Sequence, residues 1–224
     1  MPKCVGIIMD GNRRFARERG LSTVEGHRLG FEKAKEVAGW CKDAGARYLV
    51  LYAFSTENWN RPPEEVAYLT DMMKTLLLSE TGALRGENGA IRFVGDLGRF
   101  GAGFAEAARK LEAQNPPDPA LTVVIALSYG GRPEILAAVN GLLAEGAKGP
   151  LTEEEFEKRL WSAGIPDPDL ILRTGGETRL SNFLPWQSVY SELFFSDTYW
   201  PAFSKKEFDD MLAEYATRER RMGK

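Results

Sequence analysis

The sequence predicts a single α/β domain with a mainly parallel central sheet that is wrapped by helices. Short apolar runs rich in valine, isoleucine and tyrosine alternate with segments of helical periodicity, which is the pattern of successive βαβ units. The chain has 224 residues, 43% of them hydrophobic, so it can bury one sizeable core and is too short for two comfortable domains. It contains no repeat, low-complexity tract or obvious linker. We therefore predict one domain over residues 1–224.

Six segments have the composition of strands. Each is a short apolar run that lies between segments of helical pattern. The predicted strands are residues 5–9, 48–54, 91–94, 121–127, 170–172 and 193–195.

Helices are predicted between these strands. In two segments apolar residues recur at helical spacing, so each helix has an apolar face to bury against the sheet. The first face contains Phe31, Ala34, Val37, Ala38 and Cys41, and the second contains Val66, Leu69, Met73, Leu76 and Leu77.

Three further helix starts carry sequence signals. Thr152 with Glu155, and Ser204 with Glu207, fit the capping box, in which side chains satisfy the free amides of a helix start. Pro133 suits the first turn of another helix. These signals are structural and imply no chemistry.

The balance of charge argues against a nucleic-acid-binding protein. The chain has 29 basic and 32 acidic residues and a formal net charge of -3, whereas most nucleic-acid binders carry a net-basic surface. Any anion site must then be local.

The two cysteines and the N-terminal segment indicate an ordinary cytoplasmic protein. Cys4 lies in an apolar run and Cys41 on an apolar helix face, with neither metal-ligand spacing nor the density of a disulfide scaffold. We interpret both as core residues. The apolar stretches are only strand-sized and a polar motif begins at Asp10, which leaves no room for a signal peptide.

Polar, arginine-bearing loops follow three of the predicted strands. Ligands of open α/β sheets bind beyond the carboxyl ends of the strands, so we expect these loops to converge on one edge of the sheet. The first, second and third loops are Asp10-Gly11-Asn12-Arg13-Arg14-Phe15, Ser55-Thr56-Glu57-Asn58-Trp59-Asn60-Arg61 and Arg173-Thr174-Gly175-Gly176-Glu177-Thr178-Arg179-Leu180-Ser181-Asn182.

Two of these loops are candidate anion sites. The first places Gly11 and two arginines where a helix would begin, so backbone amides and guanidinium groups could hold a phosphate; the alternative is a tight turn with solvated arginines. In the third loop, Arg173, Arg179 and Ser181 offer two guanidinium groups and a hydroxyl to a second anion. Its alternative is a glycine turn in which Glu177 pairs with one arginine. Two anion sites would suit two phosphorylated substrates.

A magnesium ion is expected at this edge of the sheet. Carboxylates and phosphates repel each other unless a cation lies between them, and Mg2+ prefers one or two carboxylates plus substrate oxygens. Asp10, at the end of the first strand, and Glu192, just before the last, are the natural pair. Taken alone, Glu192 is instead a surface residue or a helix cap.

Two other side chains fit either the site or a structural role. His27, the only histidine, could donate a hydrogen bond to a diphosphate, transfer a proton or form a structural hydrogen bond. Trp59 could cover an apolar ligand or anchor its loop. The sequence leaves both choices open.

The common nucleotide-binding and hydrolase motifs are absent from the sequence. There is no GxxxxGK[ST], and Gly101-Ala102-Gly103 has no third glycine in place. There is also no GxSxG and no HExxH. Kinases, dehydrogenases and the commonest hydrolases are therefore disfavoured.

Together the loops resemble the undecaprenyl diphosphate synthase family of cis-prenyltransferases, from about Val5 to the C-terminus. The likeness is carried by IIMDGNRRFA, EGHRLG, LYAFSTENWNRP, VGDLGRF, SYGGR, PDPDLILRTGGETRLSNFLPWQ and SELFFSDTYWPAF. The resemblance implies a hydrophobic tunnel beside the sheet and a homodimer. It also implies an Mg2+-dependent enzyme that condenses isopentenyl diphosphate with an allylic prenyl diphosphate to make a Z-polyprenyl diphosphate.

The resemblance also implies roles for individual residues. Asp10, Asn58 and His27 match catalytic positions, with Asn58 as a proposed proton acceptor, and Asp10 and Glu192 match the two Mg2+ carboxylates. Gly11, Asn12, Arg13, Arg14 and Phe15 match the allylic diphosphate site, with His27 beside them. Ser55, Thr56, Glu57, Asn58, Trp59 and Arg61 match a mobile substrate-covering loop. Arg173, Arg179 and Ser181 match the isopentenyl diphosphate site, and Arg221-Met222-Gly223 resembles an RxG element that reaches a partner subunit's active site.

The chain departs from the family pattern at three places. It has DGNRRF where most bacterial members have DGNGRW, Thr23 where a phosphate-binding arginine is expected, and Pro185 where leucine is usual. Arg19 is a candidate to compensate for Thr23.

Two other functions stay open. A short-chain or irregular prenyl diphosphate synthase of the same family would have a tunnel that ends early. A non-catalytic accessory subunit would characteristically have lost the catalytic loop residues, which are present here. Peripheral membrane contact is expected from the hydrophobicity of a polyprenyl product alone.

Overall fold

A six-stranded, fully parallel sheet forms the centre of the computed structural model, which describes residues 1–75, 82, 84, 86–101 and 103–219. The strand order is β3-β4-β2-β1-β5-β6. The strands are β1 (Cys4–Ile8), β2 (Tyr48–Ser55), β3 (Ala90–Val94), β4 (Thr122–Tyr129), β5 (Leu170–Arg173) and β6 (Glu192–Phe195). All six predicted strands are confirmed, with ends that differ by one or two residues.

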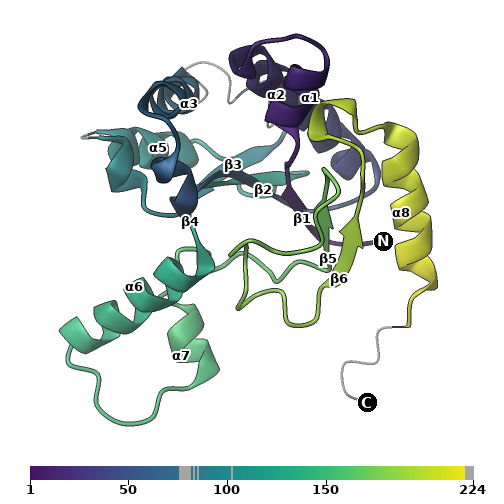
Figure 1. Cartoon of the computed structure of the whole chain (residues 1–224). Helices are drawn as coiled ribbons and strands as arrows, with labels where there is room; N and C mark the ends of the chain where they lie inside the picture. The colour runs from purple at the N-terminus through teal and green to yellow at the C-terminus, as the bar shows by residue number, and fades with distance from the viewer. Residues whose placement is uncertain (76–81, 83, 85, 102, 220–224) are drawn as a thin grey trace.

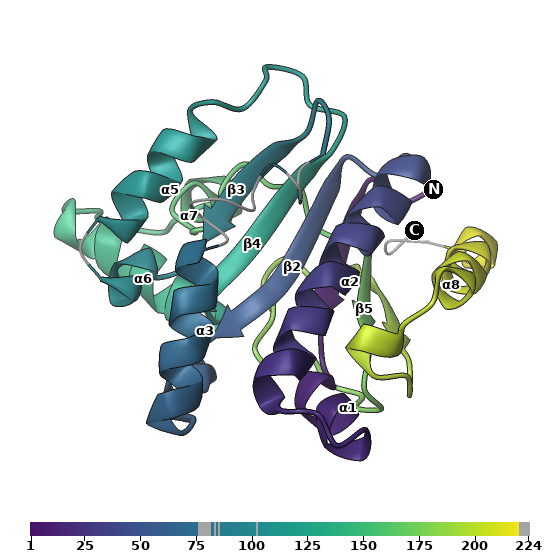
Figure 2. The ribbon, with the colours of Figure 1, turned by 90° about the horizontal axis from the view of Figure 1, so that it is seen from above.

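Helices cover both faces of this sheet. The α-helices are α1 (Asn12–Glu18), α2 (Thr23–Asp43), α3 (Pro63–Thr75), α5 (Phe104–Glu112), α6 (Gly131–Ala144), α7 (Glu153–Glu157) and α8 (Lys205–Thr217). Short 3-10 helices are η1 (Thr56–Asn60), η3 (Leu97–Phe100) and η4 (Trp200–Ala202). Helices α2, α3 and α5 lie over one face, α8 packs at one side, and α6 and α7 lie beyond the other face (Figure 1; Figure 2). The predicted α/β fold is therefore confirmed.

The strands are buried on both faces, as expected of a parallel sheet between helices. Alternate residues of β1 point to opposite sides: Val5 and Ile7 join the larger core under α2, α5 and α8, whereas Cys4 and Ile8 join a smaller core on the other face. Phe183 and Leu184, from the segment between β5 and β6, cover this smaller core. The segment between β5 and β6 thus covers this face of the sheet.

The helix predictions are confirmed where the structure describes them. On α2, Ala34, Val37, Ala38 and Cys41 are buried and Phe31 packs against them, and on α3 Leu69 and Met73 are buried while Val66 is half-buried. Leu76 and Leu77 lie outside the described residues. The capping boxes of Thr152 with Glu155 and of Ser204 with Glu207 are both formed, and Pro133 lies in the first turn of α6. A third box, Ser22 with Glu25, starts α2 and was not predicted.

Both cysteines are free and buried, as predicted for core residues. Burial raises the pKa of the Cys41 thiol to about 12, so this thiol stays protonated and unreactive at neutral pH. Among the described residues, no helix has the length and apolar character needed to cross a membrane.

Candidate active site

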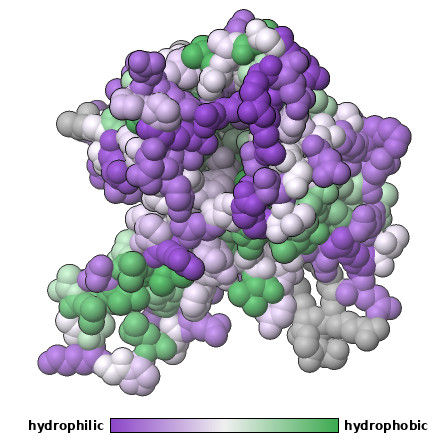
Figure 3. All heavy atoms as spheres, viewed as in Figure 1, coloured by the Kyte–Doolittle hydropathy of each residue, from purple (hydrophilic) through white to green (hydrophobic). Residues whose placement is uncertain are grey.

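A cavity of about 800 Å³ lies between α2, α3 and the carboxyl-terminal halves of β1 and β2. Nine of the predicted site residues line it: Asp10, Asn12, His27, Ser55, Glu57, Asn58, Arg61, Arg173 and Ser181. Apolar side chains of the sheet and of the two helices line the rest, including Leu51, Leu69, Met73 and Ile125. Figure 3 shows the hollow with hydrophilic residues around its mouth and hydrophobic residues within. The cavity therefore joins a polar entrance to an apolar interior.

The first and third loops meet at an ion pair between Asp10 and Arg173. An Asp10 carboxylate oxygen lies 2.8 Å from the guanidinium of Arg173, and its other oxygen lies 3.1 Å from Arg14. Arg173 is 4% exposed and also donates to the hydroxyl of Ser181 at 2.7 Å and to the carbonyl of Arg179 at 2.6 Å. One buried guanidinium thus connects the catalytic candidate of the first loop to the hydroxyl of the third.

Glycine lets these two loops touch. Gly175 has a φ of 88°, in the left-handed region, and a Cβ there would lie 2.8 Å from the guanidinium of Arg14 and 3.1 Å from the backbone carbonyl of Asp10. Any side chain would push the loops apart. Gly175 is therefore a point of contact between the two candidate anion sites.

Strained backbone marks the third loop beside the cavity. Ser181 and Asn182 have φ values of 48° and 67°, and Leu184 has 49°. Residues other than glycine adopt this region at a cost, which tertiary contacts must offset, and such residues cluster at functional sites. This backbone turns the Ser181 hydroxyl toward Arg173 and the Asn182 amide toward the second loop.

Asn182 connects the third loop to the second and to the start of α6. Its Nδ2 donates to Glu57 at 3.1 Å, its Oδ1 accepts from the backbone N–H of Arg132 at 2.9 Å, and its carbonyl accepts from Gly131 at 2.8 Å. Burial raises the pKa of Glu57, but hydrogen bonds from its own backbone, Asn182, Ser55 and Thr56 outweigh this and lower it. Glu57 is therefore ionised at neutral pH. The three loops converge as predicted.

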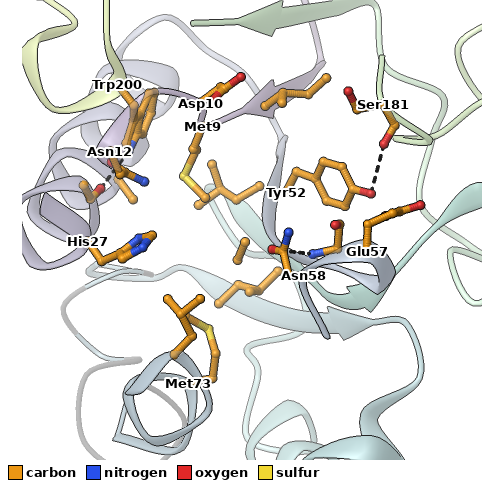
Figure 4. Close-up of a pocket in the computed structure, with 18 of the residues that line it drawn as sticks. Met9, Asp10, Asn12, His27, Tyr52, Glu57, Asn58, Met73, Ser181 and Trp200 are labelled. Atoms are coloured by element: carbon orange, nitrogen blue, oxygen red, sulfur yellow. Dashed lines mark hydrogen bonds between the residues drawn. The ribbon is translucent and has the colours of Figure 1, made fainter. Parts of the chain in front are cut away.

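The second loop contains the proposed proton acceptor and an anchor. The Oδ1 of Asn58 accepts from the backbone N–H of Ser55 at 3.1 Å, which holds the amide toward the cavity (Figure 4). Trp59 donates to Ser128 at 2.9 Å and packs edge-on against Phe54, with ring centroids 4.9 Å apart. It does not line the cavity. In this structure Trp59 anchors its loop.

Glu65, which the sequence analysis did not identify, contacts two arginines and the imidazole of His27 on the α3 side of the cavity. One of its carboxylate oxygens lies 3.1 Å from Arg61 and 3.5 Å from the imidazole of His27, and the other lies 3.6 Å from Arg13. Its side chain is only 10% exposed. The spacing of four residues from Arg61 was the only sequence signal for this pair.

His27 is neutral at physiological pH. Burial lowers its pKa from the ordinary value of 6.5, the charge of Arg61 lowers it further, and Glu65 raises it by a smaller amount. The neutral ring donates from one nitrogen and accepts at the other.

We expect the histidine ring resonance to titrate with a midpoint below 6.5 in an NMR pH series, which is unambiguous because the chain has one histidine. The unfolded chain then binds more protons than the folded one below about pH 6.5, so stability falls as the pH drops through this range. The variant Glu65→Gln loses the pKa-raising carboxylate and should titrate lower still. A midpoint above 6.5 in the unmodified protein would contradict this account.

Several predicted residues lie beside the cavity rather than in its wall. Gly11, Arg13, Arg14, Phe15, Thr56, Trp59 and Arg179 are of this kind. Phe15 is buried under Arg19, whose guanidinium lies 3.8 Å from the ring centroid, and Arg179 pairs with Glu177 as the alternative interpretation of the third loop expected. Thr23 is an exposed first residue of α2. Arg221 and Gly223 lie outside the described residues.

Glu192 does not meet Asp10 within one chain. Asp10 follows the carboxyl end of β1, whereas Glu192 begins β6 and pairs in register with Leu170, which pairs with Val5 near the start of β1. Because the strands are parallel, Asp10 lies at the carboxyl ends of the strands and Glu192 at their amino ends. Glu192 is instead paired with Arg218 at 2.7 Å. The expectation that both carboxylates face one cluster is not met by a single subunit.

Two cavity residues stand in the family motifs but were given no role in the sequence analysis. The hydroxyl of Tyr52, on β2, donates to the carbonyls of Ser181 and Tyr129 at 3.2 and 3.3 Å. The indole N–H of Trp200 donates to the carbonyl of Gly30 at 2.7 Å. Burial and the charge of Glu57 raise the pKa of Tyr52, so its hydroxyl stays protonated. Both aromatic rings lie at the wall of the cavity (Figure 4).

The arginines at the mouth of the cavity and its apolar interior define an enzyme site for substrates with an anionic head and an apolar chain. The chain matches the protein-family model described as "Putative undecaprenyl diphosphate synthase" over residues 8–223. It is 45% identical to an isoprenyl transferase of Chromobacterium violaceum, with 100% of this chain and 88% of the relative covered. It is 43% identical to an isoprenyl transferase of Thermotoga maritima, with 100% and 97% covered.

Solved structures agree with these relatives. Lavandulyl diphosphate synthase from Lavandula x intermedia, in complex with dimethylallyl diphosphate, superposes with a TM-score of 0.90 at 30% identity, covering 100% of this chain and 98% of the other. A probable undecaprenyl diphosphate synthase from Campylobacter jejuni gives 0.79 at 32%, covering 100% and 99%. The chain belongs to the undecaprenyl diphosphate synthase family and is a cis-prenyltransferase.

Proposed function

We propose that the cavity binds isopentenyl diphosphate together with an allylic prenyl diphosphate and joins them into a Z-polyprenyl diphosphate. The observation that carries this proposal is the composition of the cavity, because arginines and polar groups surround its mouth while its interior is apolar. A diphosphate suits the first part and a prenyl chain the second.

Opposite walls of the cavity suit the two substrates. Asn12 and His27 lie on one side, and Ser181 and Glu57 on the other (Figure 4). The buried Oδ1 of Asn12 has no hydrogen-bond partner within the described part of the chain. Because an amide oxygen accepts and does not donate, this atom suits a cation that accompanies a diphosphate rather than a diphosphate oxygen itself. We assign the Asn12 side to the allylic diphosphate, and the side of Arg173 and Ser181 to isopentenyl diphosphate.

The chemistry needs charge stabilisation and no covalent nucleophile. As the allylic diphosphate departs, cationic groups held in place beforehand stabilise its charge without reorganising. The double bond of isopentenyl diphosphate then attacks the allylic carbon and a proton is lost. Asn58 is our candidate to accept that proton: its carbonyl oxygen has two lone pairs, and the amide of Ser55 occupies one of them.

The donor set at Asp10 fits a magnesium ion. Mg2+ is commonly held by one or two carboxylates together with substrate phosphate oxygens and waters, and the side chain of Asp10 is 30% exposed at the cavity wall. Among the described residues, no three histidine, cysteine, aspartate or glutamate side chains form a metal cluster, so substrate oxygens would complete the site. When bound, Mg2+ would neutralise charge on the diphosphate.

The direct test is incubation of the purified protein with labelled isopentenyl diphosphate, Mg2+ and geranyl or farnesyl diphosphate in turn. We expect polyprenyl products that disappear when EDTA removes the metal. Products of a single condensation would favour a short-chain or irregular synthase, for which the lavandulyl diphosphate synthase likeness is the supporting observation. An inactive protein would leave the accessory-subunit function.

Narrowing the apolar interior should shorten the product. Ala34 of α2 lines the cavity and is 3% exposed. In the variant Ala34→Leu the added carbons occupy space of the growing chain, and we expect products shorter by about one five-carbon unit because protein interiors are close-packed. Chromatographic sizing of the products measures this.

The matched control is Ala38→Leu, one turn further along α2. Ala38 is buried but does not line the cavity. The larger side chain of this variant therefore costs about 1–3 kcal/mol of stability through overpacking but does not narrow the cavity. The product length should stay unchanged. Equal shortening in both variants would show that the cavity wall at Ala34 does not limit the chain.

We further propose that the protein works as a homodimer. Exposed apolar side chains of α6, including Leu136 and Leu143 at 61% and 65%, form a patch that is visible at the lower left of Figure 3. Val189 and Tyr190, just before the edge strand β6, are 70% and 66% exposed. Such patches mark interfaces. A second copy is also what Glu192 would need to approach an Asp10 carboxylate.

Charges on the α6 patch should separate the subunits. We expect the double variant Leu136→Glu, Leu143→Glu to have half the mass of the unmodified protein in light scattering, because an apolar interface does not accept unpaired charges. Val24→Glu, on exposed apolar surface of α2, is the control and should keep the original mass. A monomeric unmodified protein would refute the proposal.

Contact with a membrane surface is proposed from product hydrophobicity alone, and vesicle sedimentation with product present tests it.

A further inference from the structure

We propose that Arg132 is an additional diphosphate-binding residue of this active site, on the isopentenyl diphosphate side. Arg132 lines the cavity from the first turn of α6. The inference rests on the proposed function. It adds to the site an arginine from helix α6, which lies outside the three loops.

Arg132 differs from the other arginines of the cavity wall in its partners. Arg173 is paired with Asp10 at 2.8 Å, and Arg61 with Glu65 at 3.1 Å. Within the part of the chain that the structure describes, the guanidinium of Arg132 has no carboxylate partner, and the residue is exposed. Its charge is therefore available to an anion without the loss of an existing ion pair.

Arg132 adds a positive charge to the cavity wall. The charged residues that line the wall are three arginines, including Arg132, and the carboxylates of Asp10 and Glu57. Arg173 and Arg61 are already paired with carboxylates. The charge of Arg132 is not balanced in this way within the described residues, and such a charge attracts an anionic diphosphate.

The backbone around Arg132 positions it beside the third loop. The amides of Gly131 and Arg132 donate to the carbonyl and to the Oδ1 of Asn182, at 2.8 and 2.9 Å. Asn182 directly follows Ser181, whose hydroxyl is bonded to Arg173. Because these amides are already engaged, the side chain of Arg132 and not the helix end is what the site offers. Arg132 therefore shares a wall with Ser181 and Arg173.

The test compares Arg132→Gln with the unmodified protein in two measurements. In steady-state kinetics we expect KM for isopentenyl diphosphate to rise about tenfold to a hundredfold, the range for one charged hydrogen bond, while KM for the allylic substrate changes less than about threefold. In calorimetric titration with inorganic diphosphate, which needs no turnover, we expect affinity to fall by a similar factor. Arg132→Lys, which keeps the charge but loses the fork, should lie between the two.

The matched control is Arg109→Gln. Arg109 is exposed on α5, and within the described residues its side chain bonds only to a carbonyl of its own helix. Neither measurement should therefore change. Unaltered diphosphate affinity and unaltered KM in Arg132→Gln would overturn the Arg132 proposal while leaving an active enzyme. An unmodified protein that makes no prenyl product would instead refute the proposed function, and the titration would still decide whether Arg132 binds diphosphate.

Discussion

Replacing Asp10 by asparagine should lower kcat/KM about a hundredfold to a thousandfold, the range found when one preorganised charge-stabilising group is removed. The variant keeps the shape of the side chain and can still accept from Arg173. It loses the negative charge that a diphosphate-bound Mg2+ would contact. Steady-state kinetics with both substrates, together with a thermal unfolding curve, measure the effect.

The control for this variant is Asp209→Asn on α8. Asp209 forms an exposed ion pair with Lys205, whose side chain is 46% exposed, and such pairs contribute little. Its activity should equal that of the unmodified protein. Wild-type activity in Asp10→Asn would exclude a role for the carboxylate, whereas loss of activity with a collapsed unfolding temperature would assign the effect to folding.

Replacing Arg173 by methionine should reduce both stability and activity. Arg173 is buried and bonds to Asp10, Ser181 and the carbonyl of Arg179, and removing one partner from a buried ion pair costs about 3 kcal/mol at the lower end of the usual range. The lower end applies because Asp10 is 30% exposed. Urea unfolding measures the stability, and we expect kcat/KM to fall at least about a hundredfold.

Arg179→Met separates the buried arginine from its exposed neighbour. Arg179 belongs to the same loop, but its side chain is 60% exposed and pairs with Glu177. The free energy of unfolding should therefore change by less than about 0.5 kcal/mol in this variant. The double variant Asp10→Asn, Arg173→Met tests the coupling. Strictly additive losses in unfolding free energy would contradict a direct Asp10 to Arg173 interaction.

The sequence by itself determined the sheet and the loops of the site. The predicted strand of residues 170–172 is a continuous apolar run, and a polar loop that contains Arg173 and Ser181 follows it directly. In a parallel sheet the carboxyl ends of strands share one edge, so the convergence of Asp10, Glu57 and Ser181 followed from local pattern alone.

Only the tertiary structure decided which of these side chains meet. Asp10 and Arg173 are far apart in the chain yet form an ion pair, Glu65 holds His27 and two arginines, and Glu192 lies at the amino ends of the strands. Partner choice depends on register and on the packing of α3 and α6 against the sheet, which no short stretch of sequence encodes. The cavity is likewise a product of packing, since Ala34, Met73 and Arg132 line it from three different helices, α2, α3 and α6.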